Sequence, residues 1–156
     1  MKQAFKLLIC ILIPLTAGFL AGFFTTSEIP GWYQSIQKPS WNPPNWVFAP
    51  VWTFLYVTMG ISLFLVWKSG APEKVKKRAY GIFAVQLVFN FFWSFIFFKQ
   101  HQTGWALAEI ILLWLMILLT ILTFARVSKP AAWLLVPYIS WVSFAVLLNY
   151  TIWKIN

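Results

Sequence analysis

The chain has 156 residues, of which 61% are hydrophobic and only 10% are charged. Twelve lysines and arginines against three acidic residues give a formal net charge of +9. A soluble domain of this size needs more charged residues to cover its surface, so the composition indicates an integral membrane protein. Eleven tryptophans add a preference for the membrane interface, or for a pocket that satisfies the indole N–H.

Five apolar segments follow one another, and each reaches the ~20 residues that cross a bilayer as a helix. They cover about residues 5–25, 45–67, 79–98, 104–125 and 131–153. Little sequence lies between them. The sequence therefore predicts an all-α membrane protein with a single domain over residues 1–156, built as a bundle of five transmembrane helices.

The lysines and arginines predict how the bundle is oriented. With five spans, nine of the twelve fall on the side of the N-terminus, and Lys38, Lys99 and Lys154 fall on the other side. The positive-inside rule then places the N-terminus in the cytoplasm. We interpret the basic run at residues 74–78 as part of this topology signal, with binding of anionic lipid as the alternative.

The inventory of reactive side chains excludes several kinds of chemistry. The chain has no aspartate, and its acids are Glu28, Glu73 and Glu109, while His101 is the only histidine. A zinc site, a paired-carboxylate site or a Ser-His-Asp triad needs more of these groups than the chain holds. We expect no metal site, no resident cofactor and no conventional catalytic residues, and no nucleic acid as a partner.

Polar and aromatic residues recur at helical spacing on three of the spans, so that each set shares one helix face. These sets are Phe48, Trp52, Tyr56 and Met59; Gln86, Asn90, Trp93 and Ser94; and Pro137, Trp141, Phe144, Ala145, Leu148 and Asn149. Two interpretations stay open: the faces line a ligand site, or their amides join helices by hydrogen bonds worth about 0.6–2 kcal/mol. Glu109 fits a proton carrier, a neutral acid or a partner for an indole N–H.

The first span and the segment after it carry two further signals. Gly18 and Gly22 form a GxxxG pair, which serves either a homodimer or packing within the chain. Residues 27–44 contain four prolines together with Trp32, Tyr33 and Trp41. Because proline fixes φ, we predict a stiff lid over the mouth of the bundle, with an interfacial aromatic belt as the alternative.

Three stretches, Trp32–Ser62, Gln86–Phe98 and Pro137–Asn156, resemble the TspO/MBR family of tryptophan-rich sensory proteins. Its animal members are called translocator protein, or peripheral-type benzodiazepine receptor. The resemblance covers nearly the whole chain. It implies a multi-pass protein of a bacterial cell membrane, with five helices around an internal pocket, a capping loop after the first helix, and a homodimeric state.

The resemblance also implies a function. It implies binding of protoporphyrin IX and related tetrapyrroles, and of isoquinoline or benzodiazepine-type drugs, with tetrapyrrole sensing or light-dependent porphyrin degradation as the activity. Transport or export of tetrapyrroles or other apolar molecules is the alternative. A loose sterol-binding pattern near the C-terminus carries little weight.

The family's motif positions imply the site residues. The tryptophans associated with porphyrin breakdown fall on Trp52 and Trp141. Other ligand positions fall on Tyr33, Phe48, Tyr56, Asn90, Trp93, Glu109, Ile110, Leu113, Ile117 and Ala145. The lid adds Trp41, and Lys38 is the nearest cation for the propionates of a porphyrin.

Overall fold

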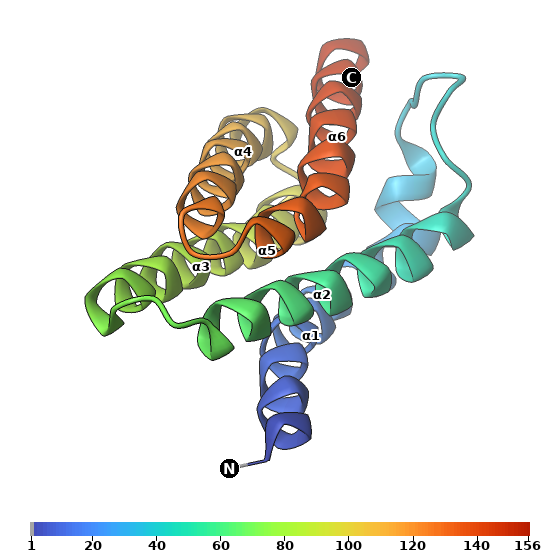
Figure 1. The fold of residues 1–156 in the computed structure, drawn as a ribbon. Helices are drawn as coiled ribbons and strands as arrows, with labels where there is room; N and C mark the ends of the chain where they lie inside the picture. The colour runs from blue at the N-terminus through green and yellow to red at the C-terminus, as the bar shows by residue number, and fades with distance from the viewer. Residues whose placement is uncertain (1) are drawn as a thin grey trace.

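The computed structural model describes residues 2–156, which fold almost entirely into helices (Figure 1). The elements are α1 (Gln3–Glu28), η1 (Ile29–Tyr33), α2 (Asn45–Lys68), α3 (Glu73–Ser94), η2 (Phe95–Lys99), α4 (Thr103–Ala125), α5 (Lys129–Leu134) and α6 (Val136–Ile155). Five helices in the described chain are long and apolar enough to cross a membrane. The prediction of an all-α membrane protein with five spans is confirmed.

The helices extend beyond the apolar segments from which the spans were predicted. The third span begins at Glu73, six residues before the predicted start at residue 79. Its first turns are charged, yet Lys76 is buried and donates from Nζ to the carbonyl oxygen of Trp67 at 2.9 Å. Lys76 thus provides a hydrogen-bond donor for a carbonyl oxygen in the last turn of α2. Hydropathy alone does not detect this role of a charged residue.

The fifth span is two helices rather than one. It breaks at Leu135, between α5 and α6, where the sequence predicts a continuous helix over residues 131–153. Pro137 has no N–H to donate to the carbonyl of Trp133, so the α-helical hydrogen-bond ladder stops there. Ser128 caps the start of α5, because its Oγ accepts from the backbone N–H of Ala131 at 3.4 Å.

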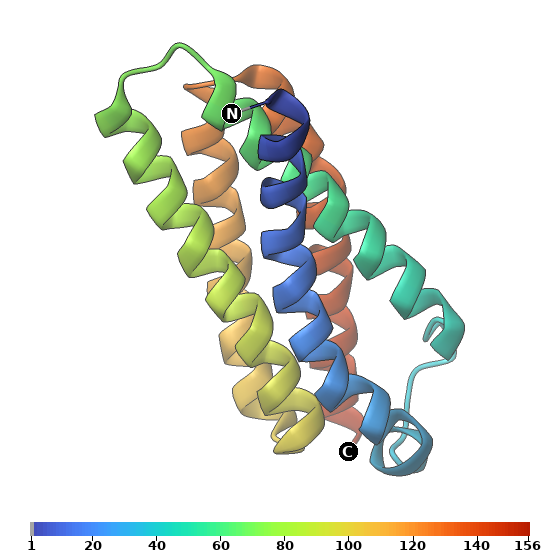
Figure 2. The same ribbon diagram turned by 90° about the horizontal axis from the view of Figure 1, so that it is seen from below.

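The two ends of the bundle differ in what they carry (Figure 2). The N-terminal end of α1 lies beside the α2–α3 and α4–α5 connections, whereas the C-terminus lies at the end that holds the lid and the α3–α4 turn. α1 packs along α2 and reaches α3, and α4 lies between α3 and α6. The lid and the end of α6 therefore share one end of the molecule.

Two glycines set the packing of α1 on α2. A Cβ at Gly60 would lie 2.8 Å from the carbonyl oxygen of Cys10 and would overlap the backbone of Ile11. A Cβ at Gly18 would overlap the ring of Tyr56. Gly18 of the GxxxG pair therefore serves packing within the chain, since it lets α1 approach a buried tyrosine of α2.

Candidate functional site

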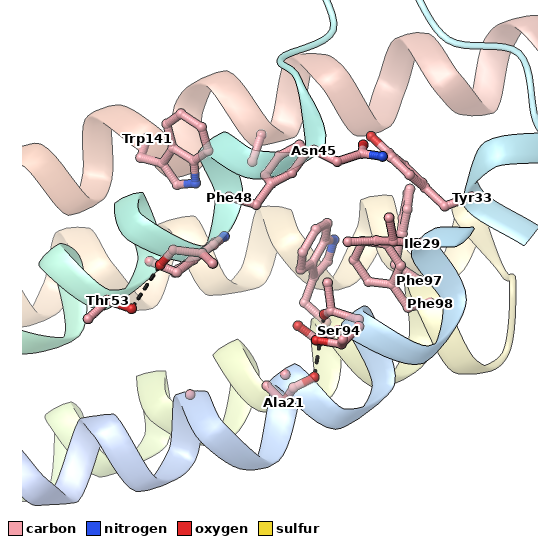
Figure 3. Close-up of a pocket in the computed structure, with 18 of the residues that line it drawn as sticks. Ala21, Ile29, Tyr33, Asn45, Phe48, Thr53, Ser94, Phe97, Phe98 and Trp141 are labelled. Atoms are coloured by element: carbon pink, nitrogen blue, oxygen red, sulfur yellow. Dashed lines mark hydrogen bonds between the residues drawn. The ribbon is translucent and has the colours of Figure 1, made fainter. Parts of the chain in front are cut away.

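A cavity of about 460 Å³ lies between α1, α2, α6 and the end of α3, below η1 (Figure 3). Its size falls in the range of drug-sized ligand sites, about 300–1,000 Å³. The lining residues are mostly apolar and aromatic: Leu15, Gly18, Phe19, Ala21, Gly22, Thr25, Thr26, Ile29, Tyr33, Asn45, Phe48, Ala49, Trp52, Thr53, Tyr56, Trp93, Ser94, Phe97, Phe98, Trp141, Phe144, Ala145, Leu148, Asn149 and Ile152.

Aromatic rings from α2 and α6 form one wall of the cavity. Trp52 stacks on Tyr56, with ring centroids 5.6 Å apart and an interplanar angle of 28°. Trp141 meets Phe48 edge to face at 6.2 Å, and its ring lies 5.4 Å from that of Phe144. Ring faces and edges in these arrangements suit a flat aromatic ligand.

Two π-helical turns, η1 and η2, form the wall that faces these rings and the end of the cavity next to the lid. η1 and η2 place Tyr33 against Phe98, with ring centroids 5.5 Å apart, and Trp93 stacks on Phe97 at 5.2 Å. Figure 3 shows Phe97 and Phe98 beside Ile29 and Tyr33, at the end of the cavity away from Trp141. A π-turn adds a residue to a helical turn and often marks a functional site. Here it aims consecutive phenylalanines at the cavity.

The position of Trp93 is fixed by hydrogen bonds. Its indole N–H donates to Oδ1 of Asn149 at 3.0 Å, and Nδ2 of Asn149 donates to the carbonyl oxygen of Thr103 at 2.9 Å. In contrast, no protein group within residues 2–156 accepts a hydrogen bond from the indole N–H of Trp52 or of Trp141. Those two donors are therefore available to a bound molecule.

The lid is fastened to the bundle by its own polar groups. Asn156, after the end of α6, accepts from the backbone N–H of Gln37 at 2.9 Å and donates to its carbonyl oxygen at 2.8 Å. Lys38 donates from Nζ to the carbonyl oxygens of Tyr33 at 2.6 Å and Ile36 at 3.0 Å. The Tyr33 hydroxyl donates to Oδ1 of Asn42 at 3.0 Å. The segment is thus a closed, internally bonded loop.

A second fastening joins the start of the lid to the α3–α4 turn. Nε2 of His101 lies 3.0 Å from a carboxylate oxygen of Glu28, and the ring of Trp32 stacks on the imidazole at 4.3 Å. His101 has a φ of 58°, which is unusual for a residue other than glycine. The only histidine is therefore a contact of the lid and does not face the cavity.

The structure brings together seven of the site residues that the sequence predicts. Each of these seven lines the cavity: Tyr33, Phe48, Trp52, Tyr56, Trp93, Trp141 and Ala145. They come from η1, α2, α3 and α6, so the predicted faces of the second, third and fifth spans meet at one place.

The other six predicted residues lie outside the cavity wall. Trp41 is 43% exposed and packs edge to face on Phe144, one layer behind the wall. Asn90 is buried below the cavity and bonds to Tyr56. The α4 residues pack in the core between α3 and α6: Glu109, Ile110, Leu113 and Ile117. Of these, Glu109 has two buried carboxylate oxygens without a hydrogen-bond partner in the described chain.

Several cavity residues were absent from the sequence prediction. Phe97 and Phe98 continue the face of Trp93 and Ser94 by one turn, a spacing signal that was available, but the π-turn that directs them inward has no sequence signature. The sequence predicts Gly22 only as a helix-packing residue, in a homodimer or within the chain. A Cβ at Gly22 would meet nothing within 4 Å, so this glycine leaves open space in the cavity.

The cavity offers neither a metal site nor an acid–base pair. No group of three or more histidine, cysteine, aspartate or glutamate side chains comes together in residues 2–156. The wall contains tyrosine and tryptophan but none of the three glutamates. What this arrangement provides is confinement, ring faces and a few neutral hydrogen-bond donors.

Comparison with known proteins assigns the chain to a family. A sequence model of the TspO/MBR family matches residues 10–154. The chain belongs to the TspO/MBR family. It is 46% identical over 155 residues to tryptophan-rich protein TspO of Chlorobaculum tepidum, covering 99% of this chain and 98% of that one.

TspO/MBR relatives are found in animals as well as bacteria. The translocator protein of Bos taurus is 42% identical over 146 residues, covering 93% of this chain and 86% of its own length. Protein CrtK of Rhodobacter capsulatus is 37% identical over 128 residues, covering 81% of this chain and 80% of its own. The resemblance that the sequence motifs indicate is confirmed, and the chain is a multi-pass integral membrane protein of this family.

Proposed function

We propose that this protein binds a flat tetrapyrrole of the protoporphyrin IX type in the cavity between α1, α2, α3 and α6. The observation that carries the proposal is that three different helices contribute Trp52, Trp93 and Trp141 to the aromatic walls of one cavity. Such a wall can stack on a macrocycle and shield it from water. The tetrapyrrole is then a ligand or substrate and not a resident cofactor.

Light-dependent oxidation of the bound porphyrin is the activity that we attach to this site. The wall contains no carboxylate or histidine for acid–base catalysis, but a porphyrin absorbs light and activates oxygen itself. The indoles of Trp52 and Trp141 are oxidisable groups on the wall. Their role in this proposal is to confine the excited ring and to react with it or with the activated oxygen.

The proposal includes the membrane in which the protein lies and the orientation of its N-terminus. The basic residues support a cytoplasmic N-terminus, because nine of the twelve lysines and arginines accompany that end of the bundle. The placement in a bacterial cell membrane is supported by the resemblance to bacterial relatives. A homodimer, and binding of isoquinoline or benzodiazepine-type drugs, rest on the family resemblance alone.

The test is a titration in the dark followed by illumination. Purified protein is titrated with protoporphyrin IX, and tryptophan fluorescence quenching reports binding. We expect saturable quenching, and then loss of the porphyrin absorbance in light. Trp52→Phe and Trp141→Phe are expected to keep the dark affinity within about threefold, because phenylalanine retains a stacking face, and to slow the light-driven loss by about tenfold or more.

Trp133→Phe is the matched control, because Trp133 is 72% exposed and does not line the cavity. It is expected to behave as the unchanged protein. Absence of saturable quenching in the dark contradicts the binding proposal. Equal bleaching in the unchanged protein and in the Trp52 and Trp141 double variant contradicts the photochemical part and leaves a sensor or carrier.

A further inference from the structure

The end of the bundle away from the lid carries a cluster of exposed cations. Its members lie on the first turns of α3 and where α4 passes into α5: Lys74, Lys77, Arg78, Arg126 and Lys129. Within residues 2–156, none of these side chains forms an ion pair with a carboxylate. We call these five residues the basic patch.

The fold brings the two parts of the basic patch together. Phe83 of α3 stacks on Phe124 of α4, with ring centroids 5.9 Å apart. Because α3 and α4 run in opposite directions, the residues that follow Phe124 lie beside those that precede Phe83. Figure 2 shows the start of α3 and the α4–α5 connection at the same end of the bundle. Cations that lie far apart in the sequence therefore share one surface.

The helical extension of α3 divides the basic run into an inner and an outer side. Lys76 is buried and donates from Nζ to the carbonyl oxygen of Trp67 at 2.9 Å. Lys74, Lys77 and Arg78 lie on the opposite side of the helix and share one face, because they are spaced three and four residues apart. One lysine of the run thus has a structural partner, and the other three cations have no partner in the described chain.

This arrangement is electrostatically unfavourable in the protein alone. Like charges three or four residues apart on a helix repel one another, and cations in the first turns oppose the positive end of the helix macrodipole. Of the three acids, only Glu73 lies at this end, and its carboxylate is 3.8 Å from the ammonium of the buried Lys76. An anion bound at the basic patch offsets both repulsions.

The basic patch lies at the depth of lipid headgroups. The apolar part of the third span begins at about residue 79, so residues 74–78 extend about 7 Å beyond it at a rise of ~1.5 Å per residue. The headgroup layer on each side of a bilayer is about 5–8 Å deep. Arg126 directly follows the apolar helix α4. The anions that surround a helix end in this layer are lipid phosphates.

We propose that the basic patch binds the headgroup of an anionic phospholipid such as phosphatidylglycerol. Arg78 and Arg126 supply planar guanidinium groups that match two phosphate oxygens, and the lysines add charge without a fixed geometry. A topology signal requires only the number of cations on one side of the membrane, and it requires neither their clustering nor their lack of acidic partners. This site is independent of the proposed tetrapyrrole cavity.

Native mass spectrometry of the protein in detergent micelles measures its affinity for an added lipid. Phosphatidylglycerol and phosphatidylcholine with the same acyl chains are compared, because the two lipids differ in net charge and share the phosphate. We expect phosphatidylglycerol to bind at least about tenfold more tightly. Equal affinities for the two lipids overturn the inference.

Two matched double variants locate the site. Lys77→Gln with Arg126→Gln removes two charges from the basic patch, whereas Lys99→Gln with Lys154→Gln removes two exposed charges at the opposite end. The first pair is expected to weaken phosphatidylglycerol binding at least about fivefold, and the second pair to change it by less than about twofold. Equal losses in the two double variants, or no loss in the first, overturn the inference.

Thermal unfolding distinguishes lipid binding from a structural role of the cations. Because the cations of the basic patch repel one another, Lys77→Gln with Arg126→Gln is expected to unfold no earlier than the unchanged protein in phosphatidylcholine micelles. The same variant is expected to lose most of the rise in Tm that phosphatidylglycerol gives the unchanged protein. Earlier unfolding in phosphatidylcholine, or an equal rise in Tm in both proteins, contradicts the proposed site.

A soluble phosphate tests whether the acyl chains matter. Glycerol 3-phosphate carries the phosphate of the lipid headgroup without the chains that hold it in the membrane layer. At the concentration of the lipid, it is expected not to displace phosphatidylglycerol from the unchanged protein. Displacement at equal concentration would assign the basic patch to a soluble phosphate compound and overturn the lipid proposal.

Discussion

A buried hydrogen-bonded chain supports the floor of the cavity. The hydroxyl of Tyr56 donates to Oδ1 of Asn90 at 2.6 Å, and Nδ2 of Asn90 donates to the hydroxyl of Tyr138 at 2.8 Å. Tyr138 in turn donates to Oε1 of Gln86 at 2.7 Å. The chain joins α2, α3 and α6. It also fixes the ring on which Trp52 stacks, so a structural bond sets the geometry of the wall.

Replacing the central amide tests this support. Asn90→Leu is expected to lower the free energy of unfolding by about 1–3 kcal/mol, because the Tyr56 hydroxyl is left buried without an acceptor. Unfolding in mixed micelles, followed by far-UV circular dichroism, measures the change. The protein is expected to keep its helix content at low denaturant.

The Tyr56→Phe change supplies the control for this prediction. In the double variant, both partners of the 2.6 Å bond are gone, so the two losses are expected to fall short of additivity by about 0.5–2 kcal/mol. Strict additivity would show that the two side chains act independently and would contradict the account.

The lid and α6 are coupled elements. Asn156 pairs with the backbone of Gln37 through two hydrogen bonds, although 119 residues separate them in the chain. The lid contains Tyr33 and leads directly into Asn45 at the start of α2, and both residues line the cavity. We therefore expect that movement of the lid away from α6 opens the end of the cavity where Tyr33 lies.

Asn156→Ala is expected to speed the release of bound protoporphyrin IX by about 3–10-fold, since it removes two exposed hydrogen bonds to Gln37 and a hydrogen bond contributes about 0.5–1.5 kcal/mol. The rate is measured by stopped-flow dilution of the preformed complex. Thr151→Ala is the matched control, because its hydroxyl donates only within α6, to the carbonyl oxygen of Leu147 at 2.9 Å. Identical release rates for Asn156→Ala and the unchanged protein would exclude the lid contact from control of release.

For the molecule as a whole, the number and position of the spans agree with the sequence prediction, whereas the ends of the helices differ from it. Runs of apolar residues mark where the bilayer lies, which is why five spans could be predicted. They do not mark a helix that continues into charge, as α3 does from Glu73, or a break imposed by Pro137. Those limits depend on caps and missing N–H donors, which hydropathy does not report.

The cavity, too, could be predicted from the sequence only in part. Trp52, Trp93 and Trp141 could be placed together from helical spacing and from the family motifs, because each lies on a face with polar neighbours. The open space beside Gly22 could not, since a small residue fits both close packing and a void. Nor could spacing show that Ile110 and Leu113 pack in the core, since apolar residues suit both environments.

If a tetrapyrrole binds in this cavity, a side chain that fills the cavity must weaken its binding. A Cβ at Gly22 meets nothing within 4 Å, so Gly22→Phe places its ring toward the open space of the cavity, whereas Gly81→Phe adds the same ring at an exposed glycine of α3 whose Cβ also meets nothing within 4 Å. Dark titration with protoporphyrin IX is the measurement. We predict that Gly22→Phe loses about tenfold or more in affinity while Gly81→Phe binds as the unchanged protein does. Unchanged binding by Gly22→Phe would show that the tetrapyrrole does not bind in this cavity.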